Sequence, residues 1–488
     1  MSDAVVRTVV GLEVHVQLLT ATKLFCGCPT IFGKPVNSQT CPICNGMPGV
    51  LPVLNRRAFE LGLKAAIAVD GNIARFTKWD RKHYFYPDLP KNYQISQYDL
   101  PFCVGGTVKI PGGDGGEKSV RLVRIHLEED AGKNTHSDAG GDSLVDLNRA
   151  GTPLLEVVTE PDMSSPAEAG AFLETVRTLM RDLDISDCEM QEGSLRCDAN
   201  INVHIEKDGM VHKTPIVEVK NLNSIKSVEK AVAYEAERQF EQWKKDGKVL
   251  GDVPKQTRGW DDPKGQTRIQ REKEDVADYR YFPDPDLVPV VVDDAWIEAV
   301  RKETGESSAE RAVRYQESYG LSKYNAETLV AKGKAGVSYF EALRELGVEA
   351  KSAANWILND LYAHAVGRIK AISDLPTSPA QLAALIGMVK ENKLNLNDAR
   401  EKVMPEMIAS GDAPDAIAKR LGLEVVVDTG AIDGVVDEVI RDMASAADDY
   451  RAGKEKALGS LVGQVMKRSK GKFPPALVNE ALLRKLKG

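Results

Sequence analysis

The sequence lacks the features of a membrane-bound or exported protein. In 488 residues the longest apolar runs, such as 287–292, are far too short to span a bilayer. The N-terminus, MSDAVVRTVVG, has no charged segment followed by an apolar one, so no signal peptide is predicted. We therefore expect a cytoplasmic protein with no membrane partner. The length alone predicts about three domains.

Several common catalytic motifs are also missing. No Gly-Lys pair is followed by Ser or Thr, which excludes a Walker-type phosphate loop. No glycine-rich dinucleotide fingerprint follows a strand pattern, and there is neither a nucleophile elbow nor a serine-rich amidase signature. Any phosphate chemistry must therefore use other groups.

Cysteine is scarce, and its placement is uneven. Four of the seven cysteines, Cys26, Cys28, Cys41 and Cys44, form two close pairs, FCGC and CPIC, with twelve residues between them. In a cytosolic chain this spacing indicates tetrahedral zinc rather than disulfides. Four protein ligands leave no open position, so we expect a structural zinc. The alternative is that the four thiols are incidental.

The stretch 120–160 carries carboxylates on strand-like segments. In 122–129, alternation places Glu129 on the face of Val123 and Ile125, and Glu128 on the opposite face with His126. In 154–160 the same alternation puts Glu156 on one face. A carboxylate that faces an apolar interior is costly unless a cation or another polar group pairs with it.

Three further segments have one apolar and one polar face. In 11–18, Glu13 and His15 lie opposite the apolar residues, and in 217–221 Glu218 does so. In 195–205 a run of Arg, Asp, Asn and His residues alternates with apolar ones. For any single strand the alternative is the solvated face of a half-buried antiparallel sheet. The density of Glu, Asp, Asn, His and Arg across all of these faces favours a functional site.

A set of carboxylates with one histidine indicates a site for a hard divalent cation. Mg²⁺ prefers oxygen ligands and commonly bridges protein carboxylates to substrate phosphates. Phosphoryl transfer, with the metal and Lys or Arg residues stabilising the charge, is therefore the favoured reaction class.

The composition changes near residue 294. Before it, strand patterns dominate, with helices predicted at 55–69, 164–183 and 224–245, and with 246–288 mostly irregular. After it, nearly every segment has helical spacing, and SGDAP at 410–414 is a natural hinge. We predict an α+β protein with a β-rich, mostly antiparallel domain at 1–294, followed by all-helical domains at 295–406 and 407–488.

The C-terminal segment is basic. Residues 451–488 contain ten Lys or Arg residues and two Glu, a net charge of +8 in a chain whose total is −8. This asymmetry indicates a nucleic-acid surface, and we expect Lys467, Arg468, Lys470 and Lys472 to bind RNA. The alternative is a solvated helical face with basic residues near helix C-termini.

These motifs together are similar to a known family. The chain resembles the B subunit of the bacterial glutamyl-/aspartyl-tRNA amidotransferase nearly end to end. The motifs that carry the resemblance are GLEVHVQL, the FCGC and CPIC pairs, YFYPDLPKNYQISQYD, HLEEDAGK, NRAGTPLLEVVTEPD, LRCDANINV, VEVKNLNS and DYRYFPDPDL.

The resemblance implies a cradle-like catalytic domain and a tRNA-binding helical tail. It implies that the chain uses ATP to phosphorylate the side-chain carboxylate of Glu-tRNA(Gln), Asp-tRNA(Asn) or both, and that ammonia then displaces phosphate. The family's Mg²⁺ site falls on His15, Glu129 and Glu156, with Glu13, Glu128 and Glu218 nearby, and its ammonia passage falls on Lys82 and Lys91. The implied partners are the amidase (A) subunit, the small (C) subunit and tRNA(Gln) or tRNA(Asn), with the cognate non-discriminating aminoacyl-tRNA synthetase as a further candidate.

Two other functions remain open from the sequence. One is an RNA-binding scaffold in which the carboxylates are structural, and ATP hydrolysis that depends on aminoacyl-tRNA would exclude it. The other is a self-sufficient amide ligase of a different fold, which would work with free ammonia and a free amino acid.

Overall fold

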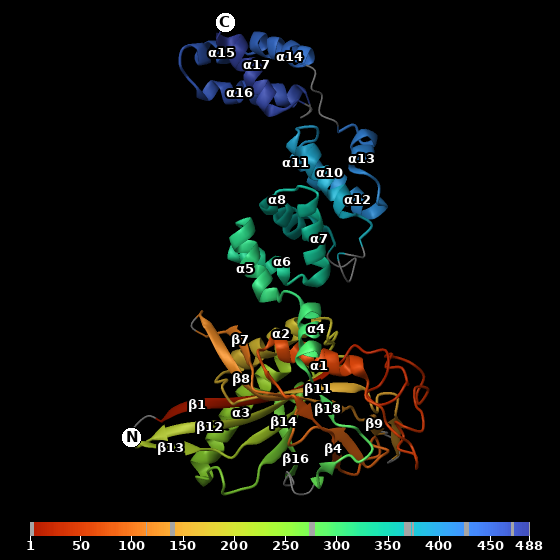
Figure 1. The fold of residues 1–488 in the computed structure, drawn as a ribbon. Coiled ribbons are helices and arrows are strands. Elements are labelled where there is room, and N and C mark those ends of the chain that lie inside the picture. Colours follow the sequence, from red (N-terminus) through yellow and green to blue (C-terminus); the bar gives the residue numbers. More distant parts are fainter. Residues whose placement is uncertain are drawn as a thin grey trace. The chain divides into compact units, whose positions relative to one another are not determined.

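The computed structural model describes residues 4–113, 115–136, 142–272, 279–365, 372, 375–423, 429–469 and 473–487. The chain divides into two compact units, Met1–Ser307 and Ser308–Gly488, which are described separately below (Figure 1).

The first unit is built on an eleven-stranded sheet. Its main path runs β16 (Gln266–Glu272), β15 (Gln256–Asp261), β14 (Val217–Leu222), β12 (Leu195–Lys207), β1 (Val5–Gln17), β11 (Pro153–Thr159), β8 (Glu117–Glu129), β6 (Cys103–Val104) and β2 (Asn72–Ile73), with β13 (Met210–Lys213) paired to β12 and β7 (Thr107–Pro111) paired to β8. Neighbours along this path are antiparallel except β14 and β15, which are parallel.

Smaller sheets lie beside the main one. They pair β9 (Lys133–His136) with β10 (Ser143–Asp146), β4 (Asp80–His83) with both β5 (Tyr93–Ser96) and β17 (Phe282–Pro283), and β3 (Phe76–Thr77) with β18 (Val290–Val291). A 3-10 turn, η1 (Asp262–Lys264), connects β15 to β16.

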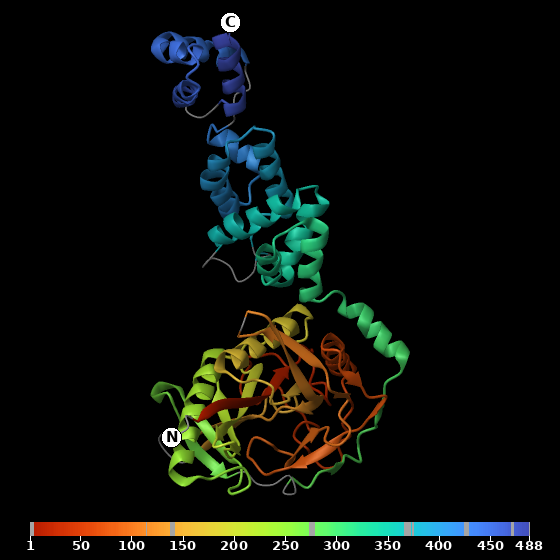
Figure 2. The ribbon, with the colours of Figure 1, turned by 90° about the vertical axis from the view of Figure 1, so that its left-hand side faces the viewer.

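Helices cover one face of the main sheet (Figures 1 and 2). The helices of this unit are α1 (Arg56–Ala68), α2 (Pro166–Asp182), α3 (Ile225–Asp246) and α4 (Asp294–Thr304). The first three lie within about two residues of the predicted ranges and begin where the side chains of Asn55, Ser165 and Ser224 accept an N–H. Buried residues of α1, α2 and α3 share one core with the apolar side chains of β1 and β12. The polar side chains of these strands therefore project from the opposite face.

Two predictions for the first unit are wrong in detail. Within the segment 246–288, predicted to be mostly irregular, β15 and β16 form a hairpin at the edge of the main sheet that the prediction missed. Val123 is not on the buried face with Ile125: its exposed fraction is 37%, whereas Leu122 is buried at 4%. The cause is a register shift opposite Val123, between Val158 and Thr159 of β11, which breaks the strict alternation.

Helices are the only kind of regular secondary structure among the described residues of the second unit. Its elements are α5 (Ser308–Tyr319), α6 (Lys323–Val330), α7 (Gly333–Glu345), α8 (Ala350–Asn355), the π-helix η3 (Trp356–Leu361), α9 (Tyr362–Ala365), α10 (Pro379–Lys390), α11 (Leu396–Asp398), the π-helix η5 (Ala399–Val403), α12 (Met404–Ser410), α13 (Pro414–Arg420), α14 (Thr429–Asp442), α15 (Ala444–Arg451), α16 (Lys456–Arg468) and α17 (Pro475–Lys487).

These helices enclose two separate hydrophobic cores. One core runs from Ala312 to Ala418, and the other from Ile432 to Leu486. The first core includes Met407 and Ile417, so it continues across residue 407, the predicted start of the tail. The three-domain division at 294 and 407 stays a prediction.

The predicted fold class is confirmed. A mostly antiparallel β-rich unit precedes a helical one. Within the described residues, every helix is too short or too polar to cross a bilayer.

Candidate active site

Four polar side chains form a row across the sheet. On the adjacent strands β8, β11, β1 and β12, His126 is directly opposite Glu156, Glu156 opposite His15, and His15 opposite Arg196. Directly paired residues on antiparallel strands have Cβ atoms about 4.5–5.5 Å apart and project from the same face. The register of the sheet, rather than any loop, therefore brings these groups together.

Glu128 joins this row from the end of β8. One ligand atom from each of His15, Glu128 and Glu156 lies within 4.8 Å of the others. The His15 Nε2 atom is 3.6 Å from Glu156 Oε2 and 3.9 Å from Glu128 Oε1. We call His15, Glu128 and Glu156 the imidazole–carboxylate cluster.

His126 lies against the same two carboxylates from the buried side. Its Nε2 atom is 3.2 Å from Glu156 Oε2 and 3.7 Å from Glu128 Oε2. Burial alone would lower the pKa of His126, but attraction to Glu156 and Glu128 outweighs burial and raises this pKa to about 9. For Glu156, burial is likewise outweighed by His126 and His15, which hold the carboxyl pKa well below its usual value.

A second cluster lies two residues further along the strands. Glu13, Asp198 and Glu218 each offer an oxygen within 4.8 Å of the others. The Lys220 ammonium lies 2.5 Å from Asp198 Oδ2 and 3.5 Å from Glu218 Oε1. Asn200 donates to Glu13 over 2.8 Å. This cluster thus already contains a cation supplied by the chain.

A buried carboxylate fixes the arginine of the row. Asp130 accepts a hydrogen bond from Gln17 at 2.7 Å, and it forms ion pairs with Arg196 at 2.8 Å and with Arg149 at 3.5 Å. Burial would raise the pKa of Asp130, but these two arginines and Gln17 lower it. Asp130 therefore stays ionised and holds the guanidinium of Arg196 beside His15.

The structure does not bring Glu129 to the imidazole–carboxylate cluster. Glu129 follows Glu128 on the strand and so points to the opposite face. There its carboxylate pairs with the Lys91 ammonium and accepts the Ile95 backbone N–H at 3.3 Å. Of the predicted metal set, His15 and Glu156 lie together with Glu128, whereas Glu129 lies on the other face; which carboxylate binds a metal stays a prediction.

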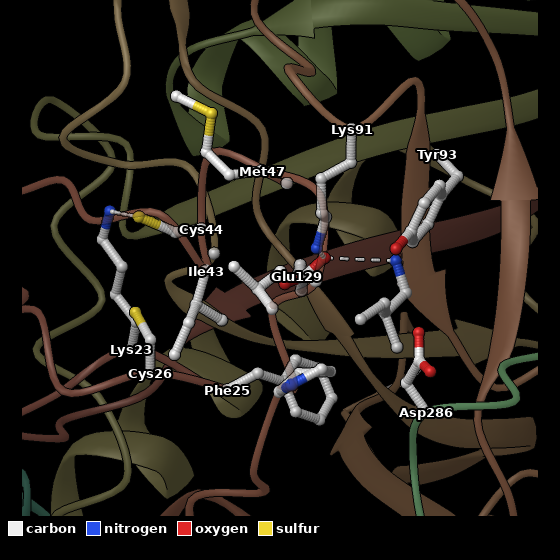
Figure 3. Close-up of a pocket in the computed structure, with 16 residues that line it drawn as sticks. Lys23, Phe25, Cys26, Ile43, Cys44, Met47, Lys91, Tyr93, Glu129 and Asp286 are labelled. Carbon is white, nitrogen blue, oxygen red and sulfur yellow. Dashed lines mark hydrogen bonds and ion pairs between the residues drawn. The ribbon is translucent and has the colours of Figure 1, made fainter.

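Glu129 and Lys91 line a small, partly open pocket on their side of the sheet. Figure 3 shows the cavity, of about 130 Å³, with Lys91, Tyr93 and Glu129 on one side and Lys23, Cys26 and Cys44 on the other. The cavity has room for a few water-sized molecules.

Lys82, the second lysine predicted to line an ammonia passage, lies elsewhere. Its ammonium is 5.1 Å from the centre of the Tyr279 ring. Burial would lower the pKa of Lys82, but attraction to Glu128, Tyr281 and Glu156 outweighs burial and raises it. Lys82 thus faces the imidazole–carboxylate cluster, whereas Lys91 faces the cavity.

The predicted zinc cysteines come together. The Sγ atoms of Cys26, Cys28, Cys41 and Cys44 all lie within 4.8 Å of one another, and those of Cys41 and Cys44 are 3.9 Å apart. A tetrahedral ion with Zn–S bonds of about 2.3 Å would place its sulfurs ~3.8 Å apart. The pKa of the Cys44 thiol is lowered to about 4, chiefly by a hydrogen bond from Cys26 and also by the Cys41 N–H and the Lys23 charge. The residues therefore fit a zinc ion, and we call 26–44 the zinc knuckle.

We expect elemental analysis of freshly purified, reduced protein to give about one zinc per chain, because tetrathiolate sites bind tightly. Cys41→Ser should lower this ratio and destabilise the first unit, while Cys188→Ser, a buried cysteine outside the knuckle, should leave the zinc content unchanged. Metal-free wild-type protein would contradict the assignment.

Several basic residues of the C-terminal segment 451–488 are paired with acidic residues of the preceding helix α14. Arg468 contacts Asp442 at 2.5 Å, Arg484 contacts Asp433 at 2.5 Å and Lys485 contacts Asp437 at 2.5 Å. Lys467 is exposed near the end of α16, and it forms no ion pair with any residue that the structure describes. Of the other predicted RNA contacts, Lys470 and Lys472 lie outside the described residues.

Several site residues were absent from the predicted set. These are His126, Asp130, Arg196, Asp198 and Lys220. Alternation placed His126 on the face of Glu128 and placed Arg196 and Asp198 together, so the signal was present. Which polar residues on such a face touch one another depends on strand order and register, which a single sequence does not give.

Comparison with known proteins covers almost the whole chain. The family described as the GatB/GatE catalytic domain matches residues 8–298, and the one described as the GatB domain matches residues 338–486. The chain is 46% identical over 475 residues to the B subunit of the aspartyl/glutamyl-tRNA(Asn/Gln) amidotransferase of Rhodopirellula baltica, covering 97% of this chain and 95% of that protein. It is 46% identical over 482 residues to the protein of the same name from Moorella thermoacetica, covering 98% and 99%. For the Geotalea uraniireducens protein of this name the identity is 47% over 486 residues, covering 99% of each chain.

Proposed function

Because this chain belongs to the family of aspartyl/glutamyl-tRNA(Asn/Gln) amidotransferase B subunits, we propose that it uses ATP to phosphorylate the side-chain carboxylate of Glu-tRNA(Gln), Asp-tRNA(Asn) or both. Ammonia from a partner amidase then replaces the phosphate. The products are Gln-tRNA(Gln) and Asn-tRNA(Asn). A small third subunit would join the two larger ones.

One observation carries this proposal: the in-register row of His126, Glu156, His15 and Arg196, with Glu128 beside it. The row places carboxylates that can hold a metal ion and a guanidinium that can bind phosphate oxygens on a single face, and both kinds of group serve phosphoryl transfer. A purely structural role would not require so many charged groups to be buried next to one another.

The two-step chemistry explains why phosphate is needed. A carboxylate oxygen attacks the γ-phosphorus of ATP, the bond to the β-phosphate oxygen breaks, and ADP leaves. Ammonia then attacks the acyl carbon, the bond to the phosphorylated oxygen breaks, and phosphate leaves as ammonia gives up one proton. Without phosphorylation the leaving group would be oxide, so direct amidation would be far too slow.

The residues of the cluster have distinct roles in this scheme. His15, Glu128 and Glu156 would hold Mg²⁺, which supplies charge neutralisation at the phosphoryl group. His126 orients Glu156 and Glu128 from behind. Arg196 and Lys82 place positive charge beside the carboxylates, where they can bind phosphate oxygens. Glu13 and Glu218 lie in the second cluster with Asp198, and we assign them to the same reaction centre.

Ammonia must reach this centre from outside the chain. We assign Lys91 and Glu129 to its path, because their paired polar groups line a pocket that can hold small polar molecules. Lys82 is assigned to the end of the path, because its ammonium interacts electrostatically with Glu128 and Glu156.

We expect the isolated chain to be unable to use glutamine but able to use ammonium salts, at much higher concentration, because it has a phosphorylation site and no glutaminase residues. The measurement is amide formation on mischarged tRNA with either nitrogen source, with and without the partner amidase. If this chain alone formed the amide with glutamine, the proposal that the partner amidase supplies the ammonia would be refuted. Incubating the assembled enzyme with each mischarged tRNA, and identifying the amino acid formed, tests the proposed substrates directly.

A further inference from the structure

Lys23 is one of the most deeply buried lysines of the first unit. Its exposed fraction is 0%, and its backbone is fixed on both sides. The Lys23 N–H donates to Cys28 O at 2.9 Å, and the next N–H, that of Leu24, donates to Gly151 O at 2.9 Å. A buried ammonium is costly unless nearby groups accept its protons, so the question is which groups do so.

The Lys23 ammonium has two acceptors. It lies 3.6 Å from Cys44 Sγ and 3.3 Å from Leu147 O. Figure 3 shows the Lys23 side chain extending alongside the knuckle to reach the sulfur of Cys44. No carboxylate among the described residues forms an ion pair with Lys23, so a cysteine sulfur is its anionic partner.

A four-cysteine zinc site creates the charge that Lys23 would balance. Four thiolates around Zn²⁺ have a net charge of −2, and Cys44 is buried. Burying that charge is unfavourable unless a cation or hydrogen-bond donors compensate it. A single ammonium beside Cys44 reduces the net charge to −1 and donates a hydrogen bond to the sulfur.

The Lys23 side chain also connects the zinc knuckle to the turn at 147–151, which is hydrogen-bonded to Asp130 beside the row of polar residues. Leu147 begins the turn that leads to Gly151, whose N–H donates to Asp130 O at 2.8 Å. The Asp130 N–H in turn donates to Thr152 O at 2.9 Å. Gly151 has a φ of +84°, and a Cβ there would lie 3.5 Å from Lys23 Cδ and 3.6 Å from Cys44 Cβ. The knuckle, Lys23 and this turn therefore form one closely packed assembly.

We propose that Lys23 is a positioning residue of the zinc knuckle, which holds the Cys44 thiolate on the metal and fixes the knuckle to the turn at 147–151. This role of Lys23 affects how tightly zinc is held, and it can be tested without measuring the proposed activity.

The test compares zinc loss from full-length Lys23→Met and wild-type protein. An excess of a coloured chelator reports the release rate. Residues that hydrogen-bond to metal ligands typically contribute 10–100-fold to metal affinity, so we expect zinc release to be about 10–100-fold faster in the variant. In cobalt-substituted protein, the sulfur-to-cobalt charge-transfer band should move to longer wavelength, because the thiolate loses a hydrogen bond.

Lys64→Met is the matched control. Lys64 is also buried in this unit, at 5% exposure, but it contacts Glu303 at 3.1 Å and Leu183 O at 3.5 Å rather than the knuckle. The control should release zinc at the wild-type rate. Equal acceleration in both variants, or a wild-type rate in Lys23→Met, would overturn the proposal.

A second variant covers the case in which Lys23→Met does not fold. Lys23→Gln keeps an N–H donor and loses the charge, so zinc release should be faster than in wild type. A wild-type release rate and an unshifted cobalt band in Lys23→Gln would also overturn the proposal.

Discussion

Glu128→Gln is expected to abolish amide formation by the assembled enzyme, by at least about 10³-fold, with either glutamine or ammonia as nitrogen source. The substitution removes one charge from the imidazole–carboxylate cluster and would weaken metal binding there. Metal stabilisation of transition-state charge contributes several kcal/mol, and each 1.36 kcal/mol is about tenfold in rate. The glutaminase activity of the partner amidase should be largely unaffected. Glu156→Gln and His15→Ala should behave in the same way.

Glu129→Gln, the next residue, is the matched control. Its side chain lies on the other face with Lys91, so Mn²⁺ binding, followed by electron paramagnetic resonance, should survive in Glu129→Gln and be lost in Glu128→Gln. If Glu129 belongs to the ammonia path, its variant should lose more activity with glutamine than with ammonia.

Full transamidation by Glu128→Gln, or loss of Mn²⁺ binding in Glu129→Gln alone, would contradict the imidazole–carboxylate cluster as the metal site. The second outcome would restore the sequence-based set of His15, Glu129 and Glu156.

The second large effect is expected on removal of the C-terminal helices. Truncation after residue 423 should raise the KM for tRNA about tenfold or more, equivalent to roughly 1.4 kcal/mol. The reason is that the enzyme loses its contacts with the phosphates of the tRNA body. The first unit should stay folded. Truncation after 406 is less suitable, because it would remove Met407, Ile408 and Ile417 from the core of the preceding helices. The KM for tRNA, measured against salt concentration in both enzymes, shows how many phosphates the tail neutralises.

Single charge reversals refine this test. Lys467→Glu should weaken tRNA binding more than Arg468→Glu, because Arg468 is already paired with Asp442. Lys302→Glu, an exposed lysine on α4 in the first unit, controls for the general change in net charge. An unchanged KM and an unchanged salt slope in the truncated enzyme would leave the tail a structural role only.

The sequence predicts the local structure of the first unit well where side chains alone determine it. The helices predicted at 55–69, 164–183 and 224–245 form within about two residues of those bounds, because helical spacing and the capping side chains Asn55, Ser165 and Ser224 act over a short range. Alternation also separates Glu128 from Glu129. It fails at Val123, because a bulge adds a residue to β8 relative to β11, and at β15 and β16, where polar residues occupy an edge hairpin.

Contacts between distant segments are harder to predict. The pairing of His126 with Glu156 and of Asp130 with Arg196 depends on the neighbours of each strand. The tail shows the same limit for charge. Its +8 composition is visible in the sequence, but the acidic partners Asp433, Asp437 and Asp442 precede the basic segment and offset part of that charge.

The opposite orientation of Glu128 and Glu129 has a consequence for how this chain can change in length. Inserting or deleting one residue between Val123 and Glu128, without a further bulge like the one at Val123, would exchange the two carboxylates between the two faces, because side chains alternate with a period of two. Glu129, the partner of Lys91, would then point into the imidazole–carboxylate cluster. Glu128, the partner of His15 and Glu156, would point into the cavity. Variation in length is therefore expected in the connection between β7 and β8, where it leaves the paired part of β8 unchanged.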